Sequence, residues 1–170
     1  GIDIIERGAG RAIDELVIDL PDGDLVDLLL AEIAQVEGVD VENIRPLAGP
    51  PPDPAVLALD IAHRVRTAGT GIDGLQVVVD GAVQLLGADW AALVDTGGSR
   101  VMASCGEEVP PEGWLVAFVQ GATTEGAPVD LQELAVAPLS SAGLALVVSR
   151  GHSPLRGREQ QVLEGLAALL

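Results

Sequence analysis

WAALVDTGGSRVMASC, residues 90–105, has two short segments rich in apolar residues on either side of Thr96-Gly97-Gly98-Ser99. Glycine and serine readily adopt the backbone conformations that tight turns require. The spacing therefore predicts a β-hairpin made of strands Trp90–Asp95 and 100–105. A hairpin of this kind indicates an antiparallel sheet at the centre of the fold.

The segments around this hairpin predict further helices and strands. Before it, apolar residues at helical spacing predict helices over 54–67, with Asp53 as N-cap, and over Ile72–Leu86. After it, the patterns predict a helix, two strands and a closing helix, over 112–123, 131–139, 143–150 and 156–170. This order predicts an α+β fold in which helices flank a central antiparallel sheet.

A proline-rich segment precedes these elements. Residues 48–54 read AGPPPDP, and three successive prolines can continue neither a helix nor a central strand. We interpret residues 48–53 as a short, stiff linker between a domain of residues 1–47 and a domain of residues 54–170.

The domain before the linker is predicted to have the order strand, strand, helix, strand. Gly8-Ala9-Gly10 predicts a turn between the first two strands, which then form a hairpin. The helix LVDLLLAEIAQVEG follows Asp24 as its N-cap and has Gly38 as its C-cap. The predicted strands are 2–7, 12–20 and 39–47.

The chain is strongly acidic, with a formal net charge of −17. Residues 1–48 hold twelve acids and three arginines, and residues 49–170 hold fourteen acids and six arginines. Such a field repels phosphate backbones and argues against nucleic-acid binding. The single cysteine cannot form an internal disulfide, and no apolar run reaches the length of a membrane span. We therefore expect a cytoplasmic protein without membrane contact.

The order of elements over residues 54–170 resembles that of a GAF domain. GAF domains commonly end with Phe-Ser/Thr-x-x-Glu and an apolar helix that closes near Leu-x-x-Leu-Ala. Arg156 replaces the usual hydroxyl residue, but the other matching positions are similar: Leu155, Glu159, Leu163, Leu166 and Ala167. The resemblance implies a non-catalytic regulatory or sensor domain whose terminal helices are bundled on one face of the sheet.

The GAF resemblance also implies where a small ligand would bind. In GAF domains the ligand lies between the sheet and the loop and helix after the second strand, which here are residues 104–123. The candidate pocket residues are Trp114, Phe118, Cys105 and Met102. Trp114 combines an apolar ring with a hydrogen-bond donor, which suits a pocket wall. The alternative is that Trp114 and Phe118 only pack this helix on the sheet.

The domain before the linker resembles the later part of an ACT domain, a ferredoxin-like regulatory module. The resemblance lies in two segments within residues 2–47, IDIIERGAGRAIDELVIDL and DLVDLLLAEIAQVEGVDVENIRPL. They correspond to its second and third strands, second helix and fourth strand, so the chain would carry an incomplete β-β-α-β module. The resemblance implies an amino acid or a similar metabolite as ligand. It leaves the fourth strand without its usual neighbour, and we expect about 30 further N-terminal residues or another chain to supply one.

Asp95-Thr96-Gly97 is the motif with the clearest catalytic interpretation. Two apolar residues followed by Asp-Thr-Gly resemble the active-site loop of retropepsin-like aspartic proteases, in which two such carboxylates share a proton. Such proteases are nearly all β, whereas residues 54–87 predict helices. A hairpin turn explains the same residues. We therefore expect no enzyme activity and keep the protease as a remote alternative.

Two further motifs have simple explanations. Gly8-Ala9-Gly10-Arg11 resembles a phosphate loop, but it lies between two strands rather than before a helix. Asp22, Asp24 and Asp27 resemble a cation loop, but acids also suit the start of a helix.

No metal or cofactor is expected. His63, His152 and Cys105 lack the spacing of metal ligands, since no two of them are closer than 42 positions. Cys105 resembles the chromophore-linked cysteine of bilin-binding GAF domains, except that Gly106 rather than histidine follows it.

Basic residues gather near the end of the chain, where Arg150, Arg156 and Arg158 surround His152. Arginines at the start of a helix oppose its dipole, so they are not there to stabilise the closing helix. We expect them to pair with acids of the preceding domain or of a partner chain.

The sequence as a whole predicts a regulatory protein that binds an amino acid or similar small metabolite. We expect a homodimer, because ACT modules pair and GAF domains often pair through their terminal helices, here 54–67 and 156–170. A scaffolding module without a ligand is the alternative.

Overall fold

The predicted hairpin is present in the computed structural model of the chain. Strand β3 (Trp90–Asp95) pairs antiparallel with β4 (Arg100–Gly106), and residues 96–99 form the turn. Strand β6 (Leu144–Ser149) pairs with the other edge of β3, and β5 (Leu134–Leu139) pairs with β6. The order across the sheet is β4-β3-β6-β5, which confirms the central antiparallel sheet.

The structure describes residues 2–8, 11–47, 49, 52–69, 71–122, 133–139, 143–151 and 154–170. The predicted turn residues 9 and 10, residues 48, 50 and 51 of the proline-rich linker, Thr123, the predicted start of β5 at residues 131–132, and His152 lie outside these ranges. The chain divides into two compact units, Gly1–Pro51 and Pro52–Leu170, which meet inside the proline-rich segment.

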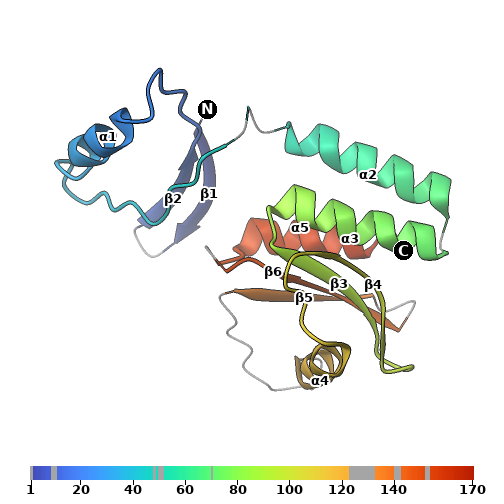
Figure 1. Cartoon of the computed structure of the whole chain (residues 1–170). Helices are drawn as coiled ribbons and strands as arrows, with labels where there is room; N and C mark the ends of the chain where they lie inside the picture. Colours follow the sequence, from blue (N-terminus) through green and yellow to red (C-terminus); the bar gives the residue numbers. More distant parts are fainter. Residues whose placement is uncertain are drawn as a thin grey trace. The chain divides into compact units, whose positions relative to one another are not determined.

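Within the described residues of the second unit, four helices flank the sheet (Figure 1). Helices α2 (Pro54–Ala68), α3 (Ile72–Leu86) and α5 (Gly157–Ala167) lie on one face, and α4 (Glu112–Ala122) lies on the other. The order is helix, helix, strand, strand, helix, strand, strand, helix, as expected. The α+β fold class is therefore confirmed. In the described part of the chain, no helix is long and apolar enough to cross a membrane.

Helices α2 and α3 form a closely packed pair. The Asp53 carboxylate caps α2, because its Oδ1 accepts hydrogen bonds from the backbone N–H groups of Ala55 (2.8 Å) and Val56 (3.3 Å). On α3, Gly81 lies so close to Ile61 that a Cβ at position 81 would be 2.9 Å from two carbons of the Ile61 side chain. The glycine therefore lets the two helices approach, and Ile61 is fully buried.

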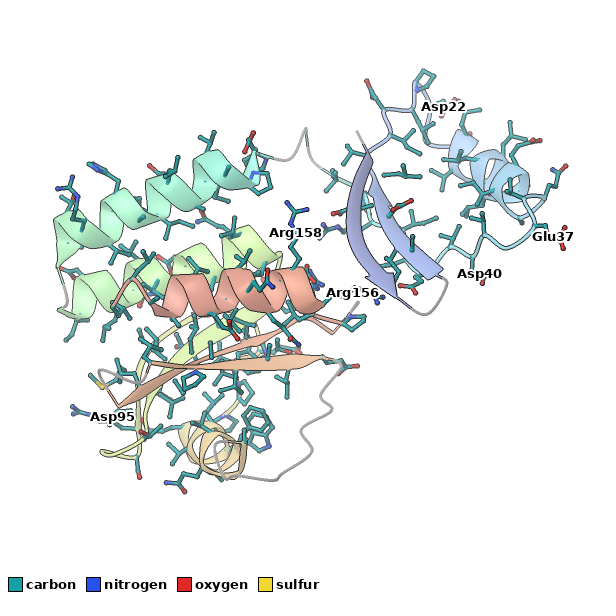
Figure 2. All side chains as sticks on the ribbon, turned by 180° about the vertical axis from the view of Figure 1, so that it is seen from behind. Asp22, Glu37, Asp40, Asp95, Arg156 and Arg158 are labelled. Carbon is teal, nitrogen blue, oxygen red and sulfur yellow. The ribbon has the colours of Figure 1, made fainter. Side chains whose placement is uncertain are left out.

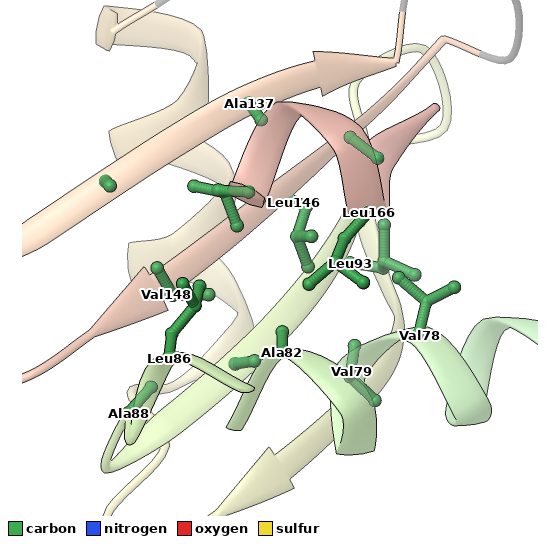
Figure 3. Packing of buried hydrophobic residues seen from close by; sticks show 14 of the residues in the cluster. Val78, Val79, Ala82, Leu86, Ala88, Leu93, Ala137, Leu146, Val148 and Leu166 are labelled. Carbon is green, nitrogen blue, oxygen red and sulfur yellow. The ribbon is translucent and has the colours of Figure 1, made fainter. Parts of the chain in front are cut away.

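The sheet carries a hydrophobic core on each face. The larger core packs α3 and α5 against the strands, where Leu93, Leu146 and Val148 are fully buried (Figure 3). The second core lies beneath α4, whose Leu115 and Val119 pack on the opposite face of the same strands. Because side chains alternate between the two faces of a strand, β3 and β6 supply both cores and read as continuous apolar runs.

The two outer strands of the sheet are protected against pairing with another chain. On β4, the backbone N–H of Val101 donates to Glu112 Oε2 (2.9 Å), and the C=O of Ser104 accepts from Gln76 Nε2 (3.2 Å). On β5, Pro138 has no N–H to donate. Blocked edges of this kind resist edge-to-edge aggregation.

The first unit contains the predicted hairpin and a shorter helix than predicted. Strand β1 (Ile2–Gly8) pairs antiparallel with β2 (Arg11–Leu16), so the hairpin is confirmed. Helix α1 (Leu25–Ile33) ends before Gly38, and the residues after it form tighter turns with hydrogen bonds between residues three apart. Val36 is 54% exposed, so no packing stabilises a further turn of helix.

Asp24 stands at the N-cap of α1, as predicted, but its side chain makes no capping hydrogen bond. The Asp24 backbone is already helical, with φ −66° and ψ −13°, whereas a capping residue has an extended backbone. Instead, Asp22 Oδ1 accepts a hydrogen bond from the Asp24 N–H (3.1 Å) and closes the turn before the helix.

The strand predicted over residues 39–47 is also wrong, because this segment has no regular secondary structure. A strand needs a neighbour for its backbone hydrogen bonds, and the sheet of this unit is described with β1 and β2 alone. Arg45 ties the segment to β2, since its Nη2 lies 3.1 Å from Glu15 Oε1. The described module is therefore β-β-α rather than the predicted β-β-α-β.

Candidate functional site

The cationic cluster near the end of the chain contains one buried arginine. Arg150 directly follows β6 and is 7% exposed. Its guanidinium pairs with both oxygens of the Glu159 carboxylate, with Nη1–Oε1 2.5 Å and Nη2–Oε2 2.8 Å. It also donates to the C=O of Leu86 at the end of α3 (2.9 Å) and to the C=O of Pro154 (2.8 Å). One side chain therefore joins β6, α3 and α5.

This pairing gives Arg150 an acidic partner nine residues later in the same unit. Glu159 Oε2 also accepts the backbone N–H of Arg156 (2.9 Å), which satisfies a donor at the start of α5. Arg156 and Arg158 stand at the beginning of this helix (Figure 2). A buried, bidentate pair with further hydrogen bonds fixes geometry, so we assign Arg150 a structural role.

Asp95 is a turn residue in the structure. Its Oδ1 accepts hydrogen bonds from the backbone N–H groups of Gly97 (3.0 Å) and Gly98 (2.8 Å). The Thr96 hydroxyl donates to the C=O of Gly143 (2.8 Å), which ties the turn to the start of β6. Figure 2 shows Asp95 at the end of the sheet opposite to the start of α5. These contacts are those of an Asx turn that closes a hairpin.

Two of the four candidate pocket residues lie together on α4. The rings of Trp114 and Phe118 stack with their centroids 5.1 Å apart and their planes 5° from parallel. Phe118 also packs against the core beneath α4, whereas Trp114 is 45% exposed. The pair therefore presents a flat apolar surface with one indole donor, which is a chemistry suited to a small organic ligand.

Met102 and Cys105 lie on the other face of the sheet, where both side chains pack against the core beneath α3 and α5. Met102 is the extra residue of a β-bulge, because the register of β4 shifts between Val101 and Ala103. The sheet thus separates the two sulfur-containing candidates from the two aromatic ones. The structure brings the aromatic pair together and does not bring the four residues into one site.

Asp80 of α3 lies beside Cys105. Burial raises the pKa of the Cys105 thiol, and the Asp80 carboxylate raises this pKa further, both as a hydrogen-bond partner and through its charge. Gln76 Nε2 donates to Asp80 Oδ1 (2.8 Å) and to the Ser104 carbonyl, so it links α3 to β4. A thiol with a raised pKa is a poor nucleophile, which makes Cys105 a packing residue.

In the described part of the chain, His, Cys, Asp and Glu side chains do not gather in groups of three or more that could hold a metal ion. His63 lies exposed on α2, with its Nδ1 3.4 Å from Arg66 Nη2. Residues 9 and 10 of the phosphate-loop motif lie outside the described residues.

Sequence reasoning does not find the partners of Glu159 and Asp80. Glu159 stands three residues after Arg156, which is the spacing of a capping box. This spacing predicts the contact of Glu159 with the Arg156 backbone N–H but not its ion pair with Arg150. No sequence signal places Asp80 beside Cys105, because the two come from a helix and a strand whose packing is not encoded in any local pattern.

No protein-family model matches the chain, and no curated protein matches it. Among solved structures, the chain is similar to the crystal structure of the GAF domain from Acinetobacter phosphoenolpyruvate-protein phosphotransferase. The identity is 16% and the TM-score 0.47, over 68% of this chain and 88% of that one. At this level of likeness, nothing about ligand or activity is transferred to this chain.

Proposed function

We propose that the chain is a non-catalytic regulatory protein whose second unit senses a small molecule. The observation that carries the proposal is the exposed half of the aromatic pair on α4: Trp114 is 45% exposed and stacks on Phe118. The pair lies within residues 104–123, where the resemblance to GAF domains implies a ligand. The order of elements in this unit agrees with that resemblance.

Two further observations support binding rather than catalysis. The Asp95 carboxylate is engaged by the backbone of its own turn, and the Cys105 thiol has a raised pKa. Carboxylates and thiols are the groups from which hydrolytic and nucleophilic sites are commonly built. Both of these have structural roles that account for their presence.

We infer that the ligand is an amino acid or a similar small metabolite. The resemblance of the first unit to an ACT domain supports this class, and its order strand, strand, helix agrees with part of that module. The net charge of −17 favours a neutral, zwitterionic or cationic molecule over a polyanion. The single free cysteine fits a cytoplasmic location.

A panel of amino acids and common nucleotides, added one by one to the full chain, tests the proposal through its melting temperature and tryptophan emission. Trp114 is 45% exposed on α4, whereas Trp90 is 6% exposed in the core beneath it, so we expect a ligand on α4 to change mainly the emission of Trp114. We expect one compound to raise the melting temperature and to shift the emission. Trp114→Phe is expected to abolish the emission change and Trp90→Phe to retain it. A panel without any thermal shift would contradict a sensor role.

A scaffold that self-associates without a ligand is the second candidate. It is favoured by two large apolar side chains on α2, Val56 and Leu59, which are 65% and 73% exposed. Apolar groups this exposed are commonly covered in an assembly. We propose self-association of the chain in either case.

A further inference from the structure

The edge strand β4 contains a β-bulge between two regularly paired segments. Val101 pairs with Val94 and Ala103 pairs with Leu93, so Met102 is the extra residue between them. Beyond a bulge of this kind, each side chain lies on the face opposite to the one that unbroken alternation would give it. The bulge therefore decides which face of the sheet each of the residues 103–105 occupies.

The three residues after the bulge are similar in size. They are Ala103, Ser104 and Cys105. In the observed register Ala103 and Cys105 pack on the core beneath α3 and α5, whereas Ser104 is exposed. A register is specified by the difference between the side chains that it buries and those that it exposes. Side chains this alike specify it weakly, so either face of the sheet can accept them.

Loss of the bulge gives a second register in which every residue after Met102 moves along β3 by one position. Ser104, which is opposite Ala92 in the structure, is then opposite Ala91. Cys105 moves from the α3 side of the sheet to the α4 side, because a shift of one residue exchanges the faces. The residue that leaves the bulge passes into the loop between β4 and α4, so the slip changes the connection to α4.

Both ends of β4 carry residues with left-handed backbones. Ser99 (φ 53°) precedes the strand and Glu108 (φ 54°) follows it, and among the described residues these are the two non-glycine residues with positive φ. Such backbones are costly and persist where surrounding contacts hold them. Helix α4 holds the first of them, since Gln120 Nε2 lies 3.3 Å from Ser99 Oγ. Contacts from outside β4 therefore help to maintain its observed conformation.

Helices on both faces of the sheet bind β4 next to the bulge. From the first turn of α4, Glu112 Oε2 accepts the Val101 N–H (2.9 Å), directly before the extra residue. From α3, Gln76 Nε2 donates to the C=O of Ser104 (3.2 Å), two residues after it. Glu112 precedes the exposed Trp114 by two residues. A displacement of the α4 surface therefore acts directly on the hydrogen bond that holds the bulge.

We propose that β4 is a two-register switch that transmits the state of α4 to α3. Release of the Val101 N–H by Glu112 lets the bulge leave the strand, and the slip that follows moves Cys105 away from Asp80 of α3. The two registers are discrete states, which is what a switch requires. This inference deepens the proposed sensor role and rests on it, because it names the element that a ligand on α4 moves.

Paired cysteines in a Cys105→Ser background distinguish the two registers. Ser104→Cys combined with Ala92→Cys forms a disulfide in the observed register, in which the two residues are directly opposite. Ser104→Cys combined with Ala91→Cys forms one in the second register, because the two side chains point to opposite faces in the first. Adding Glu112→Ala is expected to speed the second disulfide about fivefold under mild oxidation, since one hydrogen bond of the observed register is lost.

Alkylation of the natural Cys105 gives a second measurement without any cysteine introduced into the sheet. In the observed register Asp80→Asn speeds alkylation about threefold. We expect this factor to fall toward one when Glu112→Ala is also present, because Cys105 then spends more time away from Asp80. Glu107→Ala removes an exposed acid of the loop before α4 and is the matched control. It is expected to change neither the threefold factor nor the disulfide rates.

Three results would overturn the proposal. The first is a disulfide between Ala91→Cys and Ser104→Cys that is absent with and without Glu112→Ala, or that forms equally fast in both. The second is an effect of Asp80→Asn that Glu112→Ala leaves unchanged. The third is a Glu107→Ala variant that behaves as Glu112→Ala does. Neither measurement uses a ligand, so a failed register test and a failed ligand panel are separate results.

Discussion

The two units of the chain have nearly the same apolar content and opposite burial. Apolar residues make up 24 of the 51 residues in the first unit and 58 of the 119 in the second. The second unit buries Leu93, Leu146 and Val148 completely, whereas none of the described side chains of residues 12–47 is buried. Apolar composition gives a chain the capacity to form a core, but it does not form one by itself.

The difference lies in how many layers surround each sheet. Strands β3 and β6 have strand neighbours on both edges and helices on both faces, so every apolar side chain along them packs in one of the two cores. The hairpin of the first unit has two strands, and a two-stranded hairpin is marginally stable in water. We therefore expect the second unit to carry most of the stability of the chain, and the predictions below test this contrast.

The largest expected effect is that of Leu93→Ala in β3. Leu93 is fully buried, so the substitution leaves a cavity and costs about 3 to 5 kcal/mol of the free energy of unfolding. Leu28→Ala removes the same atoms from an exposed position of the first unit and costs under about 0.5 kcal/mol. Urea unfolding followed by circular dichroism measures both. Equal losses would remove the contrast between the units.

Glu159→Gln is expected to have the next largest effect. It removes the charge that balances the buried Arg150 guanidinium, while Glu159 itself is 20% exposed, so the cost is about 2 to 3 kcal/mol. Glu164→Gln on the exposed side of α5 is the control and changes stability by under about 0.5 kcal/mol. Thermal unfolding compares the two. If the two variants have the same melting temperature, the Arg150–Glu159 ion pair does not hold α5 against the rest of the second unit.

Asp95→Ala is expected to cost about 1 kcal/mol, because the Gly97 and Gly98 N–H groups lose their acceptor. Asp95→Asn keeps a carbonyl oxygen in the same place and costs less. Urea unfolding separates the two variants, and an assay with a protein substrate shows whether the chain cleaves peptides. Pepstatin-sensitive cleavage that is lost in Asp95→Asn would contradict the turn role and support the protease alternative.

The smallest expected effect is on the reactivity of Cys105. The thiolate is the reactive form, and burial together with Asp80 raises the pKa of Cys105, so iodoacetamide reacts slowly near neutral pH and faster as the pH rises through that pKa. Asp80→Asn lowers the pKa and speeds alkylation about threefold. Asp73→Asn, on the exposed side of α3, is the control. Mass spectrometry follows the rate, and slower alkylation in Asp80→Asn would refute the assignment.

The elements of the second unit could be predicted because each has a local signal. The Asp53 cap and the turn at residues 96–99 mark boundaries, and apolar periodicity identifies Ile72–Leu86 as a helix with the bounds that the structure has. Residues 39–47 alternate as a strand does, but strand formation depends on a neighbour that no local pattern encodes. Local signals for caps, turns and helices therefore succeeded in the second unit, whereas the strand signal of residues 39–47 failed in the first.

The candidate site could be predicted only where it depends on helical spacing. Trp114 and Phe118 are four residues apart on a helix, and this spacing brings their rings together. Met102 and Cys105 could not be placed, because the bulge at Met102 changes the alternation that assigns a residue to one face of the sheet. The burial of Arg150 could not be predicted either. It depends on Leu86 and Glu159, which contact the Arg150 guanidinium from two other elements.

Native-state hydrogen exchange of the full chain, read by mass spectrometry, tests the contrast between the two units most directly. We predict slow exchange for the amides of β3 and β6, which are hydrogen-bonded within the sheet and lie between two cores. We predict fast exchange over residues 12–47, where no described side chain is buried. Protection in residues 12–47 equal to that of β3 and β6 would contradict the conclusion that these residues lack a packed core of the kind that the second unit has.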